Sequence, residues 1–420
     1  MNKLMLLALT GAMTAFAGAG TAQQAAPVRA ESTAAPAPAP VAPPRAGTLG
    51  DGPWDVSTEK AKLHVSVVTK GLDHPWGMQF LPNGDILVTE RPGRLRVIRK
   101  GVLDPQPIAG VPTVLATGIA GLFDVVLHPQ FKTNRLIYLA YTKPDPNVKD
   151  QTTLAVARAR WDGGPALSDV QDIFVADSWY GALPLPKRCC GQGPASGSHG
   201  GRLAFDKKGY LYVTSGDRNF GEKVQDSSND YGKILRLHDN GGIPKDNPFV
   251  GKPGYKPEIY STGHRNPLGL VFHPVTGELW ESEFGPRGGD EVNLIKPGQN
   301  YGWIDVTQGA HYNAEPAKGV KDVPGMTDPI LTWAPSINPG NIAFYEGSKF
   351  PAWKGNLLMP NMSRSLLRVT FDAKGQPVGQ ERMLTDLKQR FRDIRIGPDG
   401  AIYLLTDETA GALLKITPGK

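Results

Sequence analysis

Three glycine-rich loops place imidazole or charged side chains among residues that are too small to cover them. The first is SGSHGGRL, in which His199 stands between Ser198 and Gly200. An imidazole has an ordinary pKa of about 6.5, so it can accept a proton near neutral pH, and the flanking glycines would let a ligand come close. His199 is therefore a candidate general base, and a histidine that caps a backbone turn is the structural alternative.

The second and third loops offer donors for oxygen atoms and ligands for a cation. STGHRNPLGLVF, from Ser261 to Phe272, carries Arg265 and Asn266 side by side. A guanidinium next to an amide suits carbonyl or carboxylate oxygens, although structural pairs of this kind are also common. The loop from Glu281 to Trp303 combines glycines with acidic residues, as a hard cation such as calcium requires. It lacks the spacing of an EF-hand, so a solvated acidic turn is the alternative.

A fourth feature is QRFRDIRIGPDG, in which Arg390 and Arg392 alternate with Phe391. Alternate residues of a strand share one face, so the two guanidinium groups would repel each other unless an anion or a carboxylate lay between them. A salt bridge inside the protein, for instance to Asp393 or to another sheet, is one explanation. An anionic cofactor is the other.

These loops alternate with a sequence motif typical of a β-hairpin, here called the hairpin phrase, which occurs six times along the chain. FLPNGDILVTE, from Phe80, and FDKKGYLYVTSGD, from Phe205, show its form: an apolar residue, a turn with Gly or Asn, and a β-rich run. The copies start about 50 to 80 residues apart, which suits one four-stranded sheet each once loop insertions are allowed. They predict an all-β fold, a six-bladed β-propeller of four-stranded antiparallel sheets.

Two further observations support the propeller. A pair of β-sandwiches, the competing fold, would not explain one hairpin phrase recurring over the whole length. The early run KLHVSVVT, from Lys62 to Thr69, is expected to join the last sheet and close the ring, which removes a free sheet edge.

The N-terminal segment predicts an exported protein. Lys3 precedes an apolar run from Leu4 to Phe16 and then small residues, the pattern of a secretory signal peptide over residues 1–22. The apolar run is too short for a membrane span, and no later segment approaches about 20 apolar residues. Residues 23–52 are mostly Ala and Pro and predict an extended linker, which leaves residues 53–420 for the propeller. The net charge of +6 is dispersed, so no nucleic-acid partner is expected.

Taken together, HGGRL, GHRNPLGL, EFGPRGGDEVNLI with NYGW, and RFRDIRIGPDGAIYLLTD resemble the soluble quinoprotein sugar dehydrogenases, which depend on pyrroloquinoline quinone (PQQ). The resemblance runs from about Gly71 to Thr417, in order and with similar spacing. It implies a six-bladed propeller located in the periplasm. It also implies oxidation of the anomeric carbon of an aldose to a lactone with PQQ and calcium, and an external electron acceptor such as a quinone, a dye or a cytochrome.

The resemblance also implies roles for individual residues. His199 matches the general base for the anomeric hydroxyl, and Arg265 with Asn266 matches the pair that contacts the quinone oxygens and stabilises charge on the reduced cofactor. Gly285 and Pro286 match the two carbonyls that bind an active-site calcium, a Lewis acid toward the quinone.

The remaining matches concern residues that bind the cofactor in the family. Arg390 and Arg392 match arginines that hold PQQ, and Trp333 in TWAPSINP falls where the family places an aromatic ring over the plane of PQQ. Some members use a lysine against a PQQ carboxylate. Its place is taken here by Ser363 in PNMSRS, and the adjacent Arg364 is the candidate to replace it.

Two other positions depart from the family pattern. Ile119 and Leu268 stand where the family commonly has glutamine. Because a charge-assisted hydrogen bond is worth roughly 1.5–3 kcal/mol, these changes together with Ser363 would weaken PQQ binding unless they are compensated. The alternative function is therefore a propeller that has lost PQQ and serves as a sugar- or protein-binding module. A calcium-dependent lactonase is a third class, which would need carboxylates converging on the centre of the ring.

The only cysteines, Cys189 and Cys190, are adjacent and lie shortly before His199. In an oxidising compartment they could close a strained disulfide ring. Such a ring would act either as a clip on an active-site loop or in electron transfer.

Overall fold

The hairpin phrases of the sequence form β-strands in the computed structural model, which describes residues 48–181, 197–312 and 319–420. These residues belong to one unit, Arg45–Lys420. The helices described in it are single turns: α1 (Phe131–Asn134) and the 3-10 turns η2 (Gly221–Lys223), η3 (Pro351–Trp353) and η4 (Thr385–Leu387). No helix among the described residues has the length and apolar character of a membrane span. The predicted signal peptide, most of the predicted linker and Cys189-Cys190 lie outside the described residues.

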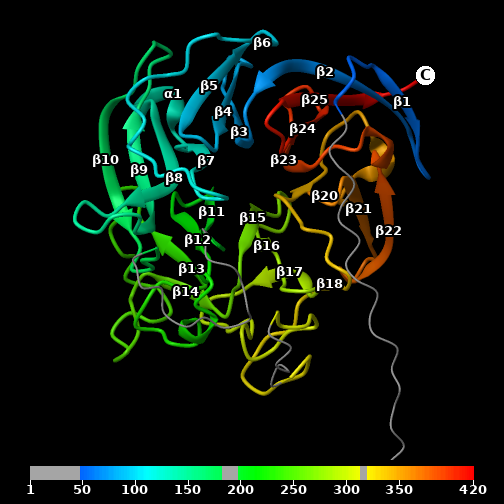
Figure 1. The fold of residues 1–420 in the computed structure, drawn as a ribbon. Helices are drawn as coiled ribbons and strands as arrows, with labels where there is room; N and C mark the ends of the chain where they lie inside the picture. Colours follow the sequence, from blue (N-terminus) through cyan, green and yellow to red (C-terminus); the bar gives the residue numbers. More distant parts are fainter. Residues whose placement is uncertain (1–47, 182–196, 313–318) are drawn as a thin grey trace, which may run out of the picture. The chain divides into compact units, whose positions relative to one another are not determined.

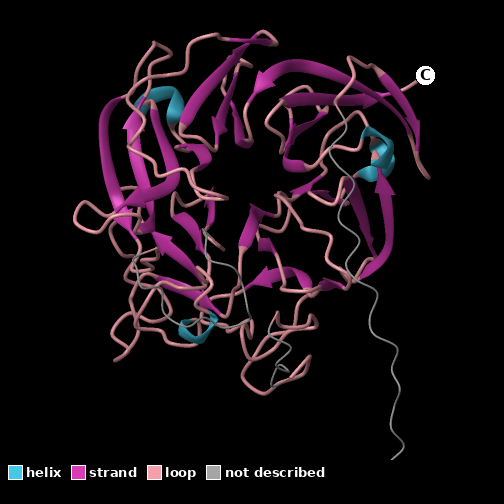
Figure 2. Cartoon of the chain, viewed as in Figure 1, coloured by secondary structure: helices cyan, strands magenta, loops and turns pink. Residues whose placement is uncertain are grey.

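The strands form six antiparallel sheets arranged in a ring (Figure 1, Figure 2), which confirms the all-β, six-bladed propeller. The first three sheets are β3 (Pro75–Phe80), β4 (Ile86–Glu90), β5 (Arg94–Arg99) and β6 (Val102–Leu103); β7 (Leu122–Leu127), β8 (Leu136–Pro144), β9 (Thr152–Arg160) and β10 (Ser168–Val175); and β11 (Gly200–Phe205), β12 (Leu211–Ser215), β13 (Lys233–Leu237) and β14 (Ile259–Thr262). The next two are β15 (Pro267–Phe272), β16 (Leu279–Glu283), β17 (Asp290–Ile295) and β18 (Leu331–Trp333); and β19 (Ala343–Phe344), β20 (Leu357–Asn361), β21 (Ser365–Phe371) and β22 (Pro377–Met383).

The sixth sheet combines both ends of the described chain. It contains β23 (Phe391–Ile396), β24 (Ile402–Thr406), β25 (Gly411–Pro418), β2 (Lys62–Leu72) and β1 (Trp54–Ser57). The pairing of β2 with β25 confirms that the early run closes the ring, and their shared core is apolar, with Leu63 and Val65 packed near Ile416. This sheet has one strand more than the four expected, because the short β1 pairs along the outer side of β2.

The first strand of each sheet explains how loops far apart in the sequence meet. β3, β11, β15 and β23 share one burial pattern: their first four residues are buried and the last two are only partly buried. The first strands of neighbouring sheets contact one another around the centre of the ring. β3 contacts β7 and β23, and β11 contacts β7 and β15. Because they enter the ring with the same polarity, the residues just before them converge on one rim.

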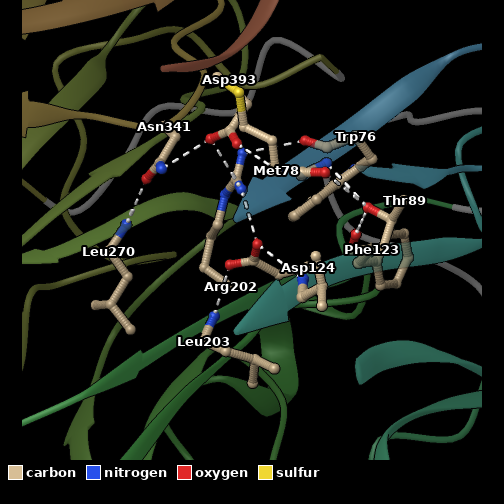
Figure 3. Close-up of polar contacts among 12 residues, drawn as sticks. Trp76, Met78, Thr89, Phe123, Asp124, Arg202, Leu203, Leu270, Asn341 and Asp393 are labelled. Atoms are coloured by element: carbon tan, nitrogen blue, oxygen red, sulfur yellow. Dashed lines mark hydrogen bonds and ion pairs between the residues drawn. The ribbon is translucent and has the colours of Figure 1, made fainter. Parts of the chain in front are cut away.

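The centre of the ring is filled by a polar network around Arg202 of β11 (Figure 3). Its fully buried guanidinium lies 3.3 Å from the carboxylate of Asp124 on β7 and 3.2 Å from that of Asp393 on β23. Nε of Arg202 donates to the carbonyl of Leu268 on β15 at 2.7 Å, and its guanidinium lies 4.1 Å from the centre of the Trp76 ring on β3. Five sheets therefore meet at one side chain.

The remaining sheet joins the same network through Asn341, which lies just before β19. Asn341 Nδ2 donates to Asp393 Oδ1 at 2.8 Å, and its Oδ1 accepts the N–H of Leu270 at 3.2 Å. A second guanidinium, that of Arg395, lies 3.5 Å from Asp124 and 3.7 Å from Asp393, so two cations face two carboxylates. Such a mostly satisfied and charge-balanced network is the condition under which buried ionic groups are tolerated. It fixes the spacing of the six first strands and thus of the rim above them.

Candidate functional site

The rim brings together four of the predicted residues from three sheets. His199 directly precedes β11, Arg265 and Asn266 directly precede β15, and Arg392 is the second residue of β23. Asn266 Oδ1 accepts the main-chain N–H of Gly200 at 3.2 Å, so the loop of His199 and the loop of Arg265 are joined directly. The sequence placed these loops more than 60 residues apart, and the common polarity of the first strands unites them.

His199 is a buried imidazole, and neither of its ring nitrogens has a hydrogen-bond partner among the residues that the structure describes. Its ring packs against Phe123, with the ring centres 5.4 Å apart. Burial, and then the positive charge of Arg218, hold the pKa of His199 well below its ordinary value, so the ring is neutral at physiological pH. Buried polar atoms without partners are rare and often mark functional groups. This neutral, unpartnered imidazole is a suitable proton acceptor.

The glycines beside His199 were expected to let a ligand come close, and in the structure they allow close packing of the loop itself. A Cβ on Gly200 would lie 2.6 Å from the carbonyl oxygen of Thr214, and one on Gly201 would lie 2.6 Å from the Phe123 ring. Both glycines also have positive φ angles, 67° and 96°, which glycine adopts readily. They allow the loop to pack closely on its neighbours, and this packing sets the direction of the imidazole.

Arg265 is a buried cation whose guanidinium meets only neutral acceptors among the described residues. Its Nη1 donates to the carbonyls of Phe284 at 3.0 Å and Gly285 at 2.8 Å, and its Nε has no hydrogen-bond partner in the described part of the chain. The guanidinium lies 5.4 Å from the centre of the Trp303 ring and 6.0 Å from that of Tyr312. A desolvated guanidinium without a carboxylate favours an anionic or strongly polar ligand.

Asp217 ties this arginine to the loop beyond β12. Its Oδ2 accepts the indole N–H of Trp303 at 2.8 Å, and its main-chain N–H donates to the carbonyl of Arg265 at 2.8 Å. Burial raises the pKa of Asp217, and the charge of Arg265 acts against that shift. Neither Asp217 nor Trp303 was among the site residues predicted from the sequence.

Arg390 and Arg392 share one carboxylate, that of Asp407. Nη2 of Arg390 lies 2.9 Å from Asp407 Oδ2, and Nη2 of Arg392 lies 2.8 Å from the same oxygen. Burial acts to raise the pKa of Asp407, but the guanidinium of Arg392 holds it below its ordinary value. Of the two explanations given by the sequence, the internal salt bridge is present, yet its acid is Asp407, because Asp393 is turned toward Arg202. The cluster still carries one excess positive charge, and Arg392 Nε has no partner.

The carbonyls of Gly285 and Pro286 are compatible with a cation on one condition. The Gly285 oxygen accepts from Arg265, and the Pro286 oxygen accepts from the Tyr312 hydroxyl at 3.1 Å. Each oxygen keeps a second lone pair, but a divalent ion there would stand close to the guanidinium of Arg265 and be repelled by it. The residues fit calcium when an anionic ligand supplies the missing negative charge.

A second group of side chains capable of metal binding lies beneath the same loop. Ligand atoms of His264, Glu281 and Glu283 are all buried and within 4.8 Å of one another. Asn293 Nδ2 lies within hydrogen-bond distance of Glu281, Glu283 and Glu291. Burial, followed by the negative charge of Glu283, raises the pKa of Glu281 and of Glu291 well above the ordinary value.

Trp333 is the last residue of β18, and Arg364 directly precedes β21. Trp333 packs in an apolar cluster with Val292 and donates its indole N–H to Gln380 Oε1 at 2.9 Å. Arg364 is half-buried and its Nε has no partner, and the neighbouring Ser363 accepts from Asn338 Nδ2 at 3.1 Å. None of the described hydrogen bonds or ring contacts joins Trp333 or Arg364 to His199 or Arg265.

The two substituted glutamine positions differ in exposure. Ile119 is exposed, whereas Leu268 is buried in an apolar cluster. A groove of about 500 Å³ between the sheets of β11 and β15 is lined by Tyr212, Tyr260 and Phe272. It lies at the opposite ends of these strands from the rim, and no predicted site residue lines it.

Comparisons with known proteins agree with this geometry. A family model described as Glucose / Sorbosone dehydrogenase matches residues 72–415. The chain is 40% identical over 364 residues to aldose sugar dehydrogenase YliI of Escherichia coli (strain K12), covering 85% of this chain and 94% of that protein. The crystal structure of the soluble aldose sugar dehydrogenase from Escherichia coli in the apo-form superposes with a TM-score of 0.77 at 39% identity, covering 85% of this chain and 100% of that one. The PQQ-bound form of an aldose sugar dehydrogenase from Streptomyces coelicolor gives a TM-score of 0.68 at 26% identity, covering 85% and 98%.

Proposed function

The chain belongs to the glucose / sorbosone dehydrogenase family, and on that premise we propose that it oxidises the anomeric carbon of an aldose to the lactone in a PQQ- and calcium-dependent reaction. It is an oxidoreductase of the PQQ-dependent sugar dehydrogenase type. The observation that carries the proposal is the buried, unpartnered imidazole of His199 on the same rim as the carboxylate-free guanidinium of Arg265.

His199 is the proposed general base. Its low pKa keeps the ring neutral, so a nitrogen is free to take the proton of the anomeric hydroxyl while the hydrogen on that carbon leaves with its electron pair. Loss of this proton and hydride converts the hemiacetal into a lactone. When bound, PQQ supplies the two-electron acceptor for the hydride, and calcium supplies a Lewis acid that polarises it.

The arginines of the rim would hold the cofactor and stabilise its negative charge. Arg265 and Asn266 are proposed to contact the quinone oxygens, where their donors act in a site largely free of water. Arg390 and Arg392 have one excess positive charge over Asp407, which suits a carboxylate of PQQ. Arg364 and Trp333 are proposed as further cofactor contacts.

Gly285 and Pro286 are the proposed calcium ligands, with PQQ supplying the anionic ligand that their surroundings lack. The sequence pattern of residues 1–22 supports export to the periplasm, with residues 23–52 as a linker and the propeller from residue 53 onward. An external quinone, dye or cytochrome would then reoxidise the cofactor.

The test is reconstitution of the purified protein with PQQ and calcium, followed by dye reduction with a panel of aldoses. We expect aldose-dependent reduction that requires PQQ and is lost in His199→Ala. The apolar residues at Ile119 and Leu268 favour the alternative, a sugar- or protein-binding module without cofactor. Sugar binding without any PQQ-dependent absorbance change or turnover would overturn the dehydrogenase and support that alternative.

A further inference from the structure

Glu283, the last residue of β16, lies directly beneath the loop that carries Arg265 and Asn266. Its buried Oε2 accepts the main-chain N–H of Arg265 and, at 3.2 Å, that of Asn266. A carboxylate that accepts two consecutive amides forms charge-assisted hydrogen bonds with both. Its position is fixed in turn by the pairing of β16 with β15, in which Glu283 stands opposite Pro267.

The other oxygen of Glu283 fixes a third residue of the same loop. Glu283 Oε1 lies 3.3 Å from Nδ1 of His264, and Nε2 of His264 lies 2.8 Å from the hydroxyl of Ser261. The His264 ring also stacks on Tyr301, with the ring centres 5.0 Å apart. One carboxylate therefore contacts three consecutive residues, two through their amides and one through its side chain.

The neighbouring carboxyl groups do not make these contacts. Glu281 and Glu291 meet the Asn293 amide, but neither accepts a hydrogen bond from the main chain of Arg265 or Asn266 among the described residues. The role is specific to Glu283, although the three carboxyls lie in one buried cluster.

We propose that Glu283 is the positioning residue that sets Arg265 and Asn266 for the cofactor, an inference that rests on the proposed function. The amides that it holds belong to the same residues whose side chains reach the carbonyl of Gly285 and the N–H of Gly200. A displacement of this main chain therefore moves both side chains together, and small misplacements of binding groups reduce rates strongly.

The first sheet contains a matched control. Glu90, the last residue of β4, stands opposite Pro75 and accepts the main-chain N–H of Asp73 at 2.9 Å, the residue two before that proline. It repeats the main-chain contact of Glu283 with Arg265, two residues before Pro267. Unlike Glu283, it also pairs with Arg94 and Arg96. Glu90 contacts none of the proposed site residues, so Glu90→Gln measures the structural cost of losing a buried carboxylate at this position of a sheet.

The experiment compares Glu283→Gln with Glu90→Gln by three measurements. The first is hydrogen exchange of residues 261–272 without added ligand. The second is PQQ affinity by titration, and the third is kcat at saturating PQQ with KM for an aldose. We expect Glu283→Gln to speed exchange of this segment, weaken PQQ binding at least tenfold and lower kcat at least tenfold, with KM changed less than threefold. Glu90→Gln should lower the melting temperature but leave these values within twofold of wild type.

The possible outcomes separate the two proposals. Unchanged exchange and PQQ affinity in Glu283→Gln, or equal losses in both variants, would overturn the positioning role. Faster exchange confined to Glu283→Gln, in a protein whose wild-type form binds no PQQ, would support positioning and overturn the proposed cofactor. If Glu283→Gln does not fold, Glu283→Asp keeps the charge but shortens the side chain, so the same measurements apply to it.

Discussion

Replacing Arg202 by methionine tests whether the central network holds the first strands together (Figure 3). The change keeps much of the side-chain length but leaves Asp124 and Asp393 without the guanidinium that lies 3.3 and 3.2 Å away. Removing one partner of a buried ion pair costs about 3–5 kcal/mol, and loss of the hydrogen bond to the Leu268 carbonyl adds about 1 kcal/mol. Against a total stability of about 5–15 kcal/mol, we expect Arg202→Met to lose a large part of the free energy of unfolding.

The loss should also depend on pH. Burial raises the pKa of Asp124, and the charge of Arg202 acts against that shift, so removing Arg202 raises this pKa further. A carboxyl whose pKa is higher in the folded than in the unfolded state costs stability progressively as pH rises above the unfolded value of about 3.9. The destabilisation of Arg202→Met should therefore be smaller at pH 5 than at pH 8.

Urea denaturation at both pH values measures these effects. Arg160→Met is the control, because Arg160 and its ion-pair partner Asp169 have exposed side chains, 48% and 73%, and such surface pairs contribute about 0–1 kcal/mol. A loss in Arg202→Met no larger than in the control, or an equal loss at pH 5 and pH 8, would refute the reasoning.

Three further predictions concern the rim. His199→Asn should lower kcat about 10²–10⁴-fold with PQQ affinity within twofold of wild type, and a fall in affinity equal to that in kcat would contradict its role as a base. The acid limb of kcat/KM should lie below pH 6.5, since burial and Arg218 lower the pKa of His199. Arg218→Met should move that limb upward, and an unmoved limb would exclude the charge as a cause. Calcium should bind at least tenfold more tightly with PQQ than without it by equilibrium dialysis, because Arg265 contacts Gly285, and PQQ should gain the same factor from calcium; independent binding would contradict this coupling.

The fold could be predicted because its repeating unit, one hairpin in each sheet, has a recognisable sequence pattern. Each hairpin phrase places a turn between two strands, and the six phrases correspond to the six sheets. The strands that escaped prediction have little pattern to show. β1 has four residues with alternating partial exposure, and β6 has two residues. Their pairing depends on neighbouring strands that the local sequence does not specify.

The sequence indicated candidate residues one by one, but not the contacts that the structure shows among them. Asp393 adjoins Arg392 in sequence, yet successive residues of a strand point to opposite faces, so Asp393 turns toward Arg202. Asp407 follows the last residue of β24, and the register pairs Thr406 with Phe391, which brings Asp407 to Arg390 and Arg392. Asp407 is close to the two arginines across the sheet, although it is well separated from them along the chain.

One signal in the sequence could have indicated the missed acids. Four of the six hairpin phrases end with an acidic residue at the close of the second strand or just beyond it: Glu90, Asp217, Glu283 and Asp407. Each of these carboxylates is buried near the start of a first strand. A carboxylate that recurs at the buried end of a strand needs hydrogen-bond donors. The nearest donors are in the segment that leads into the first strand of the same sheet.

The use of these acids explains why the rim stays receptive to anions although it contains carboxylates. Glu283 accepts mainly main-chain N–H groups, and Asp217 accepts an indole and a main-chain N–H. Neither forms an ion pair with Arg265, whose guanidinium meets only carbonyl oxygens among the described residues. Asp407 balances one of its two arginines. The carboxylates thus fix the backbone and leave positive charge unpaired, and a rim of this kind can be rigid and cationic at once.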